Sequence, residues 1–354
     1  MPKALVAMSG GVDSSAAALL AGDMGYECVG AMMRLYDNAD AGIPEGRSCC
    51  NLSDADDARR VAMKLGMRFY VFNFTDDFRR RVMGRFACEY MRGATPNPCI
   101  DCNRYMKFEK LMDRADMMGC EKLVTGHYAR VERKGGKYVL KKARDVSKDQ
   151  SYVLYMLTQD KLSRLLLPLG ELKKTEVRAI AESRGLITAR KRESQDICFA
   201  PDGDYAAVIE RCTGRKCAPG VFTDEKGAVL GRHEGVIRYT VGQRRGLGVA
   251  AGGRLYVRQI IPPENRVVLG AEDGLYSKSL TAADFNWISG EAPRHELRCR
   301  AKIRYRQPEQ PCRARRNPDG TVDVEFDEPQ RAIARGQAVV LYDGDTVLGG
   351  GTIM

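Results

Sequence analysis

The sequence predicts an α/β N-terminal domain, a parallel sheet with helices on both faces, followed by two small β-rich domains, the last barrel-like. Strand-like and helix-like patterns alternate through the first two hundred residues, which is typical of a parallel sheet with crossover helices. After about Pro201, glycines become frequent and short strand-like runs follow one another. We expect domains at residues 1–202, 203–276 and 277–354.

Short apolar runs and helix-start signals place the elements of the first domain. The predicted strands are 3–8, 26–33, 68–74 and 122–125. The predicted helices are 14–24, one from an N-cap at Ser53 to about Gly66, 78–91 and 105–118. Asp54, Asp56 and Asp57 follow Ser53, and carboxylates in a first turn stabilise the positive end of a helix.

The remaining chain shows the patterns of short strands and tight turns. Strands are predicted at 236–241, 255–261 and 266–269, and a second β-rich stretch runs from 280 to the end. Asn-Pro-Asp-Gly at 317–320 and Asp-Gly at 343–344 are turn signals within that stretch. Residues 36–50, with Gly42, Pro44 and Gly46, are predicted to form a surface loop.

Charge and composition limit the classes of partner. The chain carries 57 Lys and Arg against 46 Asp and Glu, a net charge of +11, which suits an anionic partner such as nucleic acid. Three basic segments, 133–148, 235–263 and 291–316, could contact the phosphates of a long nucleic acid. No apolar run approaches the roughly 20 residues of a transmembrane helix, and no secretory signal is visible. We expect a cytoplasmic protein without a membrane partner.

The strongest local signal is Ala-Met-Ser-Gly-Gly-Val-Asp-Ser-Ser at 7–15, between the first strand and the first helix. Gly10 and Gly11 allow a tight turn and a close approach to a ligand. Serine hydroxyls, unpaired N–H groups and the helix dipole then favour phosphate. The spacing excludes a Walker loop and a Gly-x-Gly-x-x-Gly dinucleotide loop.

Two cysteine segments indicate sulfur chemistry. Thr-Pro-Asn-Pro-Cys-Ile-Asp-Cys-Asn occupies 95–103, and Cys102 is expected just before a helix, whose dipole would lower the pKa of its thiol. Cys198 follows a basic run at 190–192, and these cations would lower its pKa as well. The chain has twelve cysteines, and the others carry no functional signal, including the adjacent Cys49 and Cys50.

Metal-based alternatives remain open but are not favoured. There is no second Cys-x-x-Cys, and His127, His233 and His295 are scattered, which argues against structural zinc. Cys99, Cys102 and Cys198 could instead hold an iron–sulfur cluster with one iron open for sulfide. No other metal-ligand set is predicted.

The chain resembles the tRNA-specific 2-thiouridylase family of the PP-loop ATP pyrophosphatase superfamily along essentially its whole length. The motifs are Ser-Gly-Gly-Val-Asp-Ser-Ser at 9–15, Thr-Pro-Asn-Pro-Cys-x-x-Cys-Asn at 95–103, Thr-Gly-His-Tyr at 125–128, Lys-Asp-Gln-Ser-Tyr at 148–152, Ser-Gln-Asp-Ile-Cys-Phe at 194–199, Tyr-Thr-Val-Gly-Gln-Arg at 239–244 and Ile-Arg-Tyr-Arg at 303–306. The resemblance implies an adenine-nucleotide alpha-hydrolase-like catalytic domain and a C-terminal domain that contacts tRNA.

The implied activity is that of an ATP-dependent tRNA sulfurtransferase. Such an enzyme adenylates O2 of the wobble uridine and replaces it with persulfide sulfur, which yields 2-thiouridine, AMP and pyrophosphate. The implied partners are tRNA and a persulfide donor, either a cysteine desulfurase or a sulfur-relay protein, and Mg²⁺ is expected with ATP. The alternatives are an iron–sulfur-dependent thiolase, another PP-loop tRNA-adenylating enzyme, and a non-catalytic tRNA-binding protein.

The resemblance also implies roles for individual residues. Cys198 would carry the persulfide, and Cys102 would attack it and form a Cys102–Cys198 disulfide, or act on the activated base directly. ATP would be bound by Ala7, Met8, Ser9, Gly10, Gly11, Val12, Asp13, Ser14, Met33 and Gly126. Residues that would contact tRNA are Asn97, Pro98, Cys99, His127, Lys148, Asp149, Gln150, Arg304, Tyr305 and Gln337.

One position departs from a family pattern. Some members carry Asp where this chain has Cys99, and that Asp is a candidate general acid and base. A thiol, with an unperturbed pKa of about 8.5, is a different catalyst. The acid–base assignment therefore stays open at this position.

Overall fold

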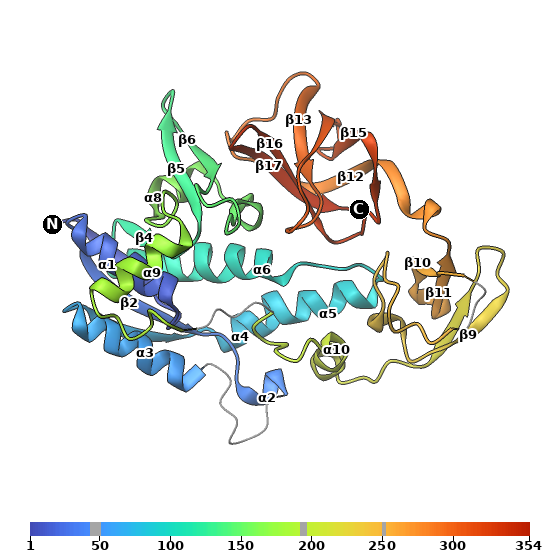
Figure 1. The fold of residues 1–354 in the computed structure, drawn as a ribbon, viewed down its shortest axis with the longest axis horizontal. Helices are drawn as coiled ribbons and strands as arrows, with labels where there is room; N and C mark the ends of the chain where they lie inside the picture. The colour runs from blue at the N-terminus through green and yellow to red at the C-terminus, as the bar shows by residue number, and fades with distance from the viewer. Residues whose placement is uncertain (43–50, 192–196, 250–252) are drawn as a thin grey trace.

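The computed structural model describes residues 1–42, 51–191, 197–249 and 253–354 (Figure 1). Cys49, Cys50 and the segment Ser194, Gln195 and Asp196 lie outside the described residues, as does most of the loop predicted at 36–50. The described chain forms a five-stranded, a four-stranded and an eight-stranded sheet. No helix in the described ranges is long and apolar enough to cross a membrane.

The N-terminal sheet is parallel, as predicted, with strand order β3-β2-β1-β4-β7. Its strands are β1 (Lys3–Ala7), β2 (Glu27–Arg34), β3 (Arg68–Asn73), β4 (Lys122–Val124) and β7 (Leu165–Leu166). The chain leaves β1 toward β2 on one side and later returns to β4 on the other. Open α/β sheets bind ligands at such a switch in strand order, which here lies at the carboxyl ends of β1 and β4.

Helices cover both faces of this sheet, as predicted. Ala4 and Val6 pack on one face against α1 (Val12–Asp23), α3 (Asn51–Lys64) and α9 (Lys174–Ser183). Leu5 and Leu123 pack on the other face in a larger core. That core includes side chains of α4 (Thr75–Phe78), the π-helix η1 (Arg79–Met83), α5 (Gly84–Met91), the π-helix η2 (Cys102–Lys110) and α7 (Leu111–Met117).

Two predicted helix starts are wrong. The helix predicted from Ser53 already includes Asn51, so Ser53 lies inside α3; Asn51, Ser53 and Asp54 all favour helix starts, and the sequence cannot choose among them. The helix predicted from 105 begins at Pro98 with α6 (Pro98–Asp101) and continues through η2 into α7. The Asn97 side chain caps it by accepting a hydrogen bond from the Cys99 N–H, and Pro98 occupies the first turn.

Short elements connect the first sheet to the rest of the molecule. They are α2 (Asn38–Ala41), η3 (Ser151–Leu154), α8 (Gln159–Arg164) and α10 (Tyr205–Thr213). Helix α10 packs on α5, and Tyr205 lies edge-on to Phe86 of that helix, 5.8 Å between ring centroids.

The central sheet has the order β10-β11-β8-β9. Its strands are β8 (Gly220–Thr223), β9 (Val229–His233), β10 (Tyr256–Ile261) and β11 (Arg266–Gly270). The strand predicted at 236–241 is wrong, because this run holds the 3-10 helix η4 (Val236–Arg238). Val236 and Ile237 are both buried, and so short an apolar run does not distinguish a strand from a buried turn.

The C-terminal strands close into a barrel, as predicted. The pairing runs β12-β15-β14-β13-β16-β17, and β12 also pairs with β17. The strands are β12 (Tyr276–Trp287), β13 (Leu297–Lys302), β14 (Gln310–Arg316), β15 (Val322–Arg331), β16 (Ala338–Asp343) and β17 (Thr346–Ile353). The predicted turns at 317–320 and 343–344 connect β14 to β15 and β16 to β17.

A hairpin from the N-terminal half extends the barrel sheet. Strands β5 (Ala129–Lys134) and β6 (Lys137–Lys142) pair with each other, and β6 pairs with β17 (Figure 1). The sequence analysis treated this region only as a basic segment, because its charges obscure the alternation of a strand. The hairpin thereby makes the N-terminal half and the barrel share one sheet.

Buried hydrogen bonds also fasten the barrel to residues 151–159. The hydroxyl of fully buried Tyr152 donates to the carbonyl of Ala338 over 2.8 Å. The Asn286 amide of β12 donates to the carbonyls of Tyr155 and Leu157, over 2.6 and 3.0 Å. These bonds fix the barrel relative to the first sheet, since a buried polar group without its partner is costly.

We predict that Tyr152→Phe lowers the free energy of unfolding by about 1–2 kcal/mol, because the Ala338 carbonyl loses its donor in a buried place. Urea unfolding followed by fluorescence measures the change. Tyr276→Phe is the control, since Tyr276 is 48% exposed. Equal unfolding midpoints for Tyr152→Phe and the wild type would contradict the assignment.

Candidate active site

The loop after β1 has the backbone of a phosphate-binding turn. Gly10 has φ +73°, and a Cβ there would lie 2.3 Å from the carbonyl oxygen of Asp54, so only glycine fits. Gly11 is the N-cap of α1 and offers no capping side chain. The first N–H groups of this twelve-residue helix therefore face the crevice between β1 and β4 without a side-chain cap, as an anion site requires.

The serines of this loop do not act alike. The Ser14 hydroxyl donates to the Gly11 carbonyl and accepts from the Ser9 N–H, over 3.0 and 3.1 Å. Ser15 is fully buried and donates to the same carbonyl over 2.9 Å. Ser14 and Ser15 thus shape the loop, whereas Ser9 is exposed; a contact of these hydroxyls with phosphate stays a prediction.

Asp13 is held from two sides. Lys174, which is 8% exposed, places its ammonium 2.7 Å from both carboxylate oxygens, and the Tyr128 hydroxyl donates to one of them over 2.7 Å. The charge of this carboxylate is thus balanced beside the loop. Within the described ranges no cluster of three His, Cys, Asp or Glu could hold a metal ion, so we derive no step through a protein-held Mg²⁺.

The segment after β4 packs against the same loop. A Cβ on Gly126 would lie 2.8 Å from the Asp13 carbonyl carbon and 2.9 Å from the Ser14 nitrogen. Ala7, Met33 and Gly126 stand at or just beyond the carboxyl ends of β1, β2 and β4. The fold thereby brings together the three places from which nucleotide contacts were expected.

The segment bearing Cys198 is anchored by aromatic side chains. The Tyr36 hydroxyl donates to the Cys198 carbonyl over 2.6 Å. Phe199 is buried edge-on against Phe78 and Phe86, with ring centroids 5.7 and 5.4 Å away. These contacts hold Cys198 against the helices that follow β3.

The three candidate thiols share one electrostatic environment. Cys99 and Cys198 keep exposed surface and Cys102 is half-buried, yet many protein atoms surround each of the three thiols. Burial raises the pKa of Cys102 to about 11, and it raises the pKa of Cys99. The pKa of Cys198 rises further, through burial and then through the neighbouring Cys102 and Cys99.

The predicted lowering of both thiol pKa values is therefore wrong. Cys102 lies one turn inside the helix that starts at Pro98, so the unpaired N–H groups lie near Cys99 instead. Lys191 binds Asp54 and Asp57 rather than Cys198, with distances of 2.5 and 2.6 Å. All three thiols are free, and the described residues contain no three-donor group that would support the cluster alternative.

Lys107 is the residue that the sequence analysis missed. Its charge counteracts the raised pKa values of Cys99, Cys102 and Cys198. Its ammonium lies 3.4 Å from Nε2 of His127, a buried ring whose Nδ1 lies 2.8 Å from the Thr125 hydroxyl. No motif indicated Lys107, because its position depends on the helix geometry after Cys102. His127, expected to contact tRNA, is directed into the protein here.

Five other residues were expected to contact tRNA: Asn97, Pro98, Lys148, Asp149 and Gln150. Asp149 accepts bonds from the backbone N–H groups of Ala143 and Ser151, and Gln150 accepts from the N–H of Tyr128, so both order the chain beside the site. Lys148 is half-buried next to them. Asn97 caps its helix and Pro98 is buried.

A hollow of about 420 Å³ forms where the segment before α6 meets the central region and the barrel. It is lined by Thr95, Thr240, Val241, Gly242, Gln243, Arg304, Ala334 and Gln337. The Gln337 amide donates to the Thr95 carbonyl over 2.6 Å, which fixes the barrel side of the hollow to the segment that precedes Cys99. Tyr305, next to Arg304, is 37% exposed and lies edge-on to Tyr152.

Many of the basic side chains are already paired. Lys141, Lys142 and Arg144 bind carboxylates, and so do Arg258, Arg298, Arg300, Arg313 and Arg315. Across the part of the chain that the structure describes, Arg244, Arg245, Arg254, Arg304 and Arg306 have no carboxylate partner. These five arginines lie in the central and barrel regions.

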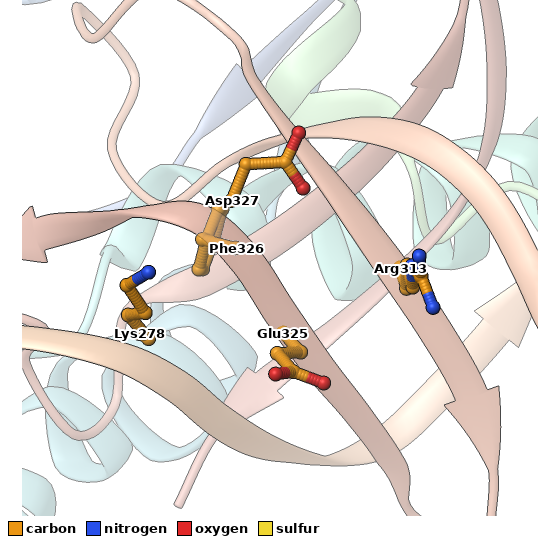
Figure 2. A pocket seen from close by; sticks show the side chains of 5 residues that line it. All are labelled: Lys278, Arg313, Glu325, Phe326 and Asp327. Carbon is orange, nitrogen blue, oxygen red and sulfur yellow. The ribbon is translucent and has the colours of Figure 1, made fainter.

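A second hollow lies on the barrel, away from these residues. Figure 2 shows Lys278, Arg313, Glu325, Phe326 and Asp327 around a space of about 290 Å³. Arg298 binds Asp327 over 2.6 Å, and Arg313 binds Glu296 over 3.6 Å. Its mixed charges and carboxylates do not suit a phosphate chain.

Comparisons with known proteins agree along the whole chain. Family models match residues 2–202 (tRNA methyl transferase HUP domain), 207–271 (tRNA methyl transferase PRC-barrel domain) and 277–353 (Aminomethyltransferase beta-barrel domain). The tRNA-specific 2-thiouridylase MnmA of Lachnoclostridium phytofermentans is 48% identical over 100% of both chains. That of Acetivibrio thermocellus is 49% identical over 99% of both chains.

Among solved structures, a 4-thiouridine synthetase in complex with RNA and bound ATP is 19% identical, with a TM-score of 0.40, over 60% of this chain and 53% of that one. This likeness is too partial to carry an argument.

We predict that Gly126→Ala weakens ATP binding about tenfold or more, because the added Cβ meets the backbone of Asp13 and displaces the loop. Calorimetric titration with ATP measures the dissociation constant. Gly22→Ala is the matched control, since a Cβ at this position in α1 has nothing within 4 Å. An unchanged dissociation constant for Gly126→Ala would show that the loop tolerates the displacement.

Proposed function

The chain belongs to the tRNA-specific 2-thiouridylase family, and we propose that it uses ATP and persulfide sulfur to convert the wobble uridine of tRNA into 2-thiouridine. One observation carries the proposal. Gly126 packs on the nucleotide loop, and the next residue, His127, contacts the lysine whose charge reaches all three thiols. A nucleotide site and a sulfur site are therefore adjacent.

The nucleotide site accounts for the first half of the reaction. The C2 carbonyl of uridine is a poor electrophile, because its oxygen is a bad leaving group. Attack of O2 on the α-phosphate of ATP releases pyrophosphate and makes that oxygen part of a phosphate ester, which can leave as AMP. The helix N-terminus and Ser9 support the phosphates during this step.

The thiols account for the second half. In one route, the Cys102 thiolate attacks the Cys198 sulfur of the persulfide, a Cys102–Cys198 disulfide forms, and hydrosulfide leaves to displace AMP from C2. In the other, the persulfide attacks C2 first, AMP leaves, and Cys102 then cleaves the sulfur–sulfur bond. Both routes end with the same disulfide, which an external reductant must open before the next turnover.

Cys99 acts differently from an aspartate at the same position. Burial raises the pKa of its thiol, so at neutral pH it is protonated and can donate a proton but is a poor base. We propose that Cys99 lines the base pocket together with Asn97 and Pro98, and that it donates rather than accepts a proton there.

The proposed tRNA surface consists of the arginines without carboxylate partners among the described residues and of the hollow that Arg304 and Gln337 line. Arg244, Arg245, Arg254, Arg304 and Arg306 can neutralise phosphates, and Tyr305 can stack on an unpaired base. Lys148, Asp149, Gln150 and Gln337 border this surface. The persulfide comes from a donor protein, and a tRNA substrate fits a cytoplasmic location.

We predict that Cys102→Ser and Cys198→Ser each abolish thiolation, with rates lower by more than about 1,000-fold, because a hydroxyl neither carries nor attacks persulfide sulfur. Mass spectrometry of nucleosides from tRNA incubated with ATP and a sulfur donor measures 2-thiouridine. Cys88→Ser is the control, since this thiol is exposed on α5. Full activity of Cys198→Ser would refute the persulfide role, and a different adduct would favour another adenylating chemistry.

We predict that tRNA affinity falls steeply with salt and that Arg304→Gln reduces the slope of log affinity against log salt by about 1. Filter binding at several salt concentrations measures both quantities. Lys278→Gln removes the same charge from the hollow in Figure 2 and serves as the control. If both substitutions lower the slope equally, the tRNA surface is not the one proposed.

A further inference from the structure

The helix that carries Cys102 changes its geometry at that residue. Residues Cys102–Lys110 form the π-helix η2, in which hydrogen bonds join residues five apart. Residues at positions i and i+5 then lie on the same side of the helix. The Lys107 side chain therefore lies on the side that carries Cys102. Met106, which an α-helix would place nearest that side, is fully buried, as is Phe108. Extended π-helical turns are rare and frequently mark functional sites.

His127 holds the Lys107 ammonium in place. Burial, and then the charge of Lys107, keep the pKa of His127 well below its ordinary value, so the ring is neutral. Its Nδ1 is 2.8 Å from the Thr125 hydroxyl and its Nε2 is 3.4 Å from the Lys107 nitrogen. When the proton of the His127 ring is on Nδ1 and is donated to the Thr125 hydroxyl, the unprotonated Nε2 accepts a hydrogen bond from the Lys107 ammonium. Among the described residues, Lys107 has no carboxylate partner, so its charge is not cancelled.

We propose that Lys107, positioned by His127 and by the π-helical register, supplies the positive charge that stabilises anionic sulfur in this site. The anions are the Cys102 thiolate, the Cys198 persulfide and the hydrosulfide that leaves it. The thiolate part does not depend on the proposed function, and the persulfide and hydrosulfide parts rest on it.

The charge balance of the transfer step shows why a cation is needed. The Cys102 thiol first loses its proton to solvent. Its sulfur then bonds to the Cys198 sulfur of the protonated persulfide, the bond between that sulfur and the outer sulfur breaks, and the electron pair leaves with the outer sulfur and its proton as hydrosulfide. One negative charge therefore persists throughout and moves from Cys102 to the departing sulfur, and a fixed cation beside both positions stabilises each state.

The other charged and titratable groups do not replace Lys107. Asp101 raises the pKa of Cys102, and its carboxylate lies 3.4 Å from Arg85. Tyr305 from the barrel faces Cys99, and burial raises the pKa of its hydroxyl. Lys107 lowers the pKa of Cys99, Cys102 and Cys198 alike, against the raising effect of burial.

Alkylation of the full-length enzyme without ATP or tRNA tests the proposal. The rate of iodoacetamide modification at Cys102, followed by peptide mass spectrometry between pH 6.5 and pH 10, reports the thiolate fraction. Removing a cation disfavours the thiolate and raises the thiol pKa. Lys107→Met should therefore move the profile upward by about one pH unit and slow modification about tenfold at pH 7.5.

Matched variants separate charge from structure. Lys107→Arg should stay close to the wild type, since it keeps the charge. Lys110→Met, which removes a lysine of the same helix that binds Asp77, should leave the profile unchanged. Lys107→Gln replaces Lys107→Met if melting shows that the methionine variant is unfolded. A wild-type profile in the uncharged variants, or an equal shift in Lys110→Met, would overturn the proposal.

The outcome is independent of the thiolation assay. An upward shift together with active Cys102→Ser and Cys198→Ser variants would keep Lys107 as the thiolate-stabilising residue and reject the proposed function. An unchanged profile together with inactive cysteine variants would reject the role of Lys107 and keep the proposed function.

Discussion

The close contact between Gly126 and the first turn of α1 is the constraint on which the site depends. Because glycine brings the backbone after β4 within van der Waals reach of Asp13 and Ser14, the carboxyl ends of β1 and β4 form one narrow crevice. His127 follows directly and contacts Lys107 on the helix that bears Cys102. A bulkier residue at 126 would separate the nucleotide loop from the thiol-bearing helix. The short contact thus places the nucleotide loop next to the residue that contacts Lys107, as the proposed coupling of base activation and sulfur transfer requires.

Burial of the thiols is the second feature on which the site depends. Protein around Cys102 and Cys198 raises their pKa values, so the resting enzyme holds them protonated and slow to oxidise. In the proposed reaction each sulfur-transfer step carries a negative charge, which surrounding protein makes costly. Lys107, held by a neutral histidine and without a carboxylate partner among the described residues, is the group that we propose to offset part of this cost.

The sequence analysis predicted the features that depend on local patterns. The parallel sheet, the glycine turn after β1 and the turns of the barrel follow from short-range residue preferences, and the structure confirms them. One missed feature is local, since Asn97 caps the helix and Pro98 occupies its first turn. The others depend on tertiary contacts: η2 presents Lys107 because Met106 and Phe108 enter the core. The thiol pKa values go up rather than down because burial outweighs nearby charges, and Arg190 and Lys191 bind carboxylates instead.

The basic residues divide into those that hold the domains together and those that have no carboxylate partner among the described residues. Lys142 of the hairpin binds Glu309 of the barrel, and Arg130 binds Asp345, so these cations hold the barrel against the catalytic half. Those that remain without carboxylates, such as Arg304 beside Gln337, border the junction where the segment leading to Cys99 meets the barrel. The first set makes the frame rigid, and the second set is the one that we propose to bind phosphate. Phosphate contacts read no sequence, so only a rigid frame would let them place one uridine next to the thiols.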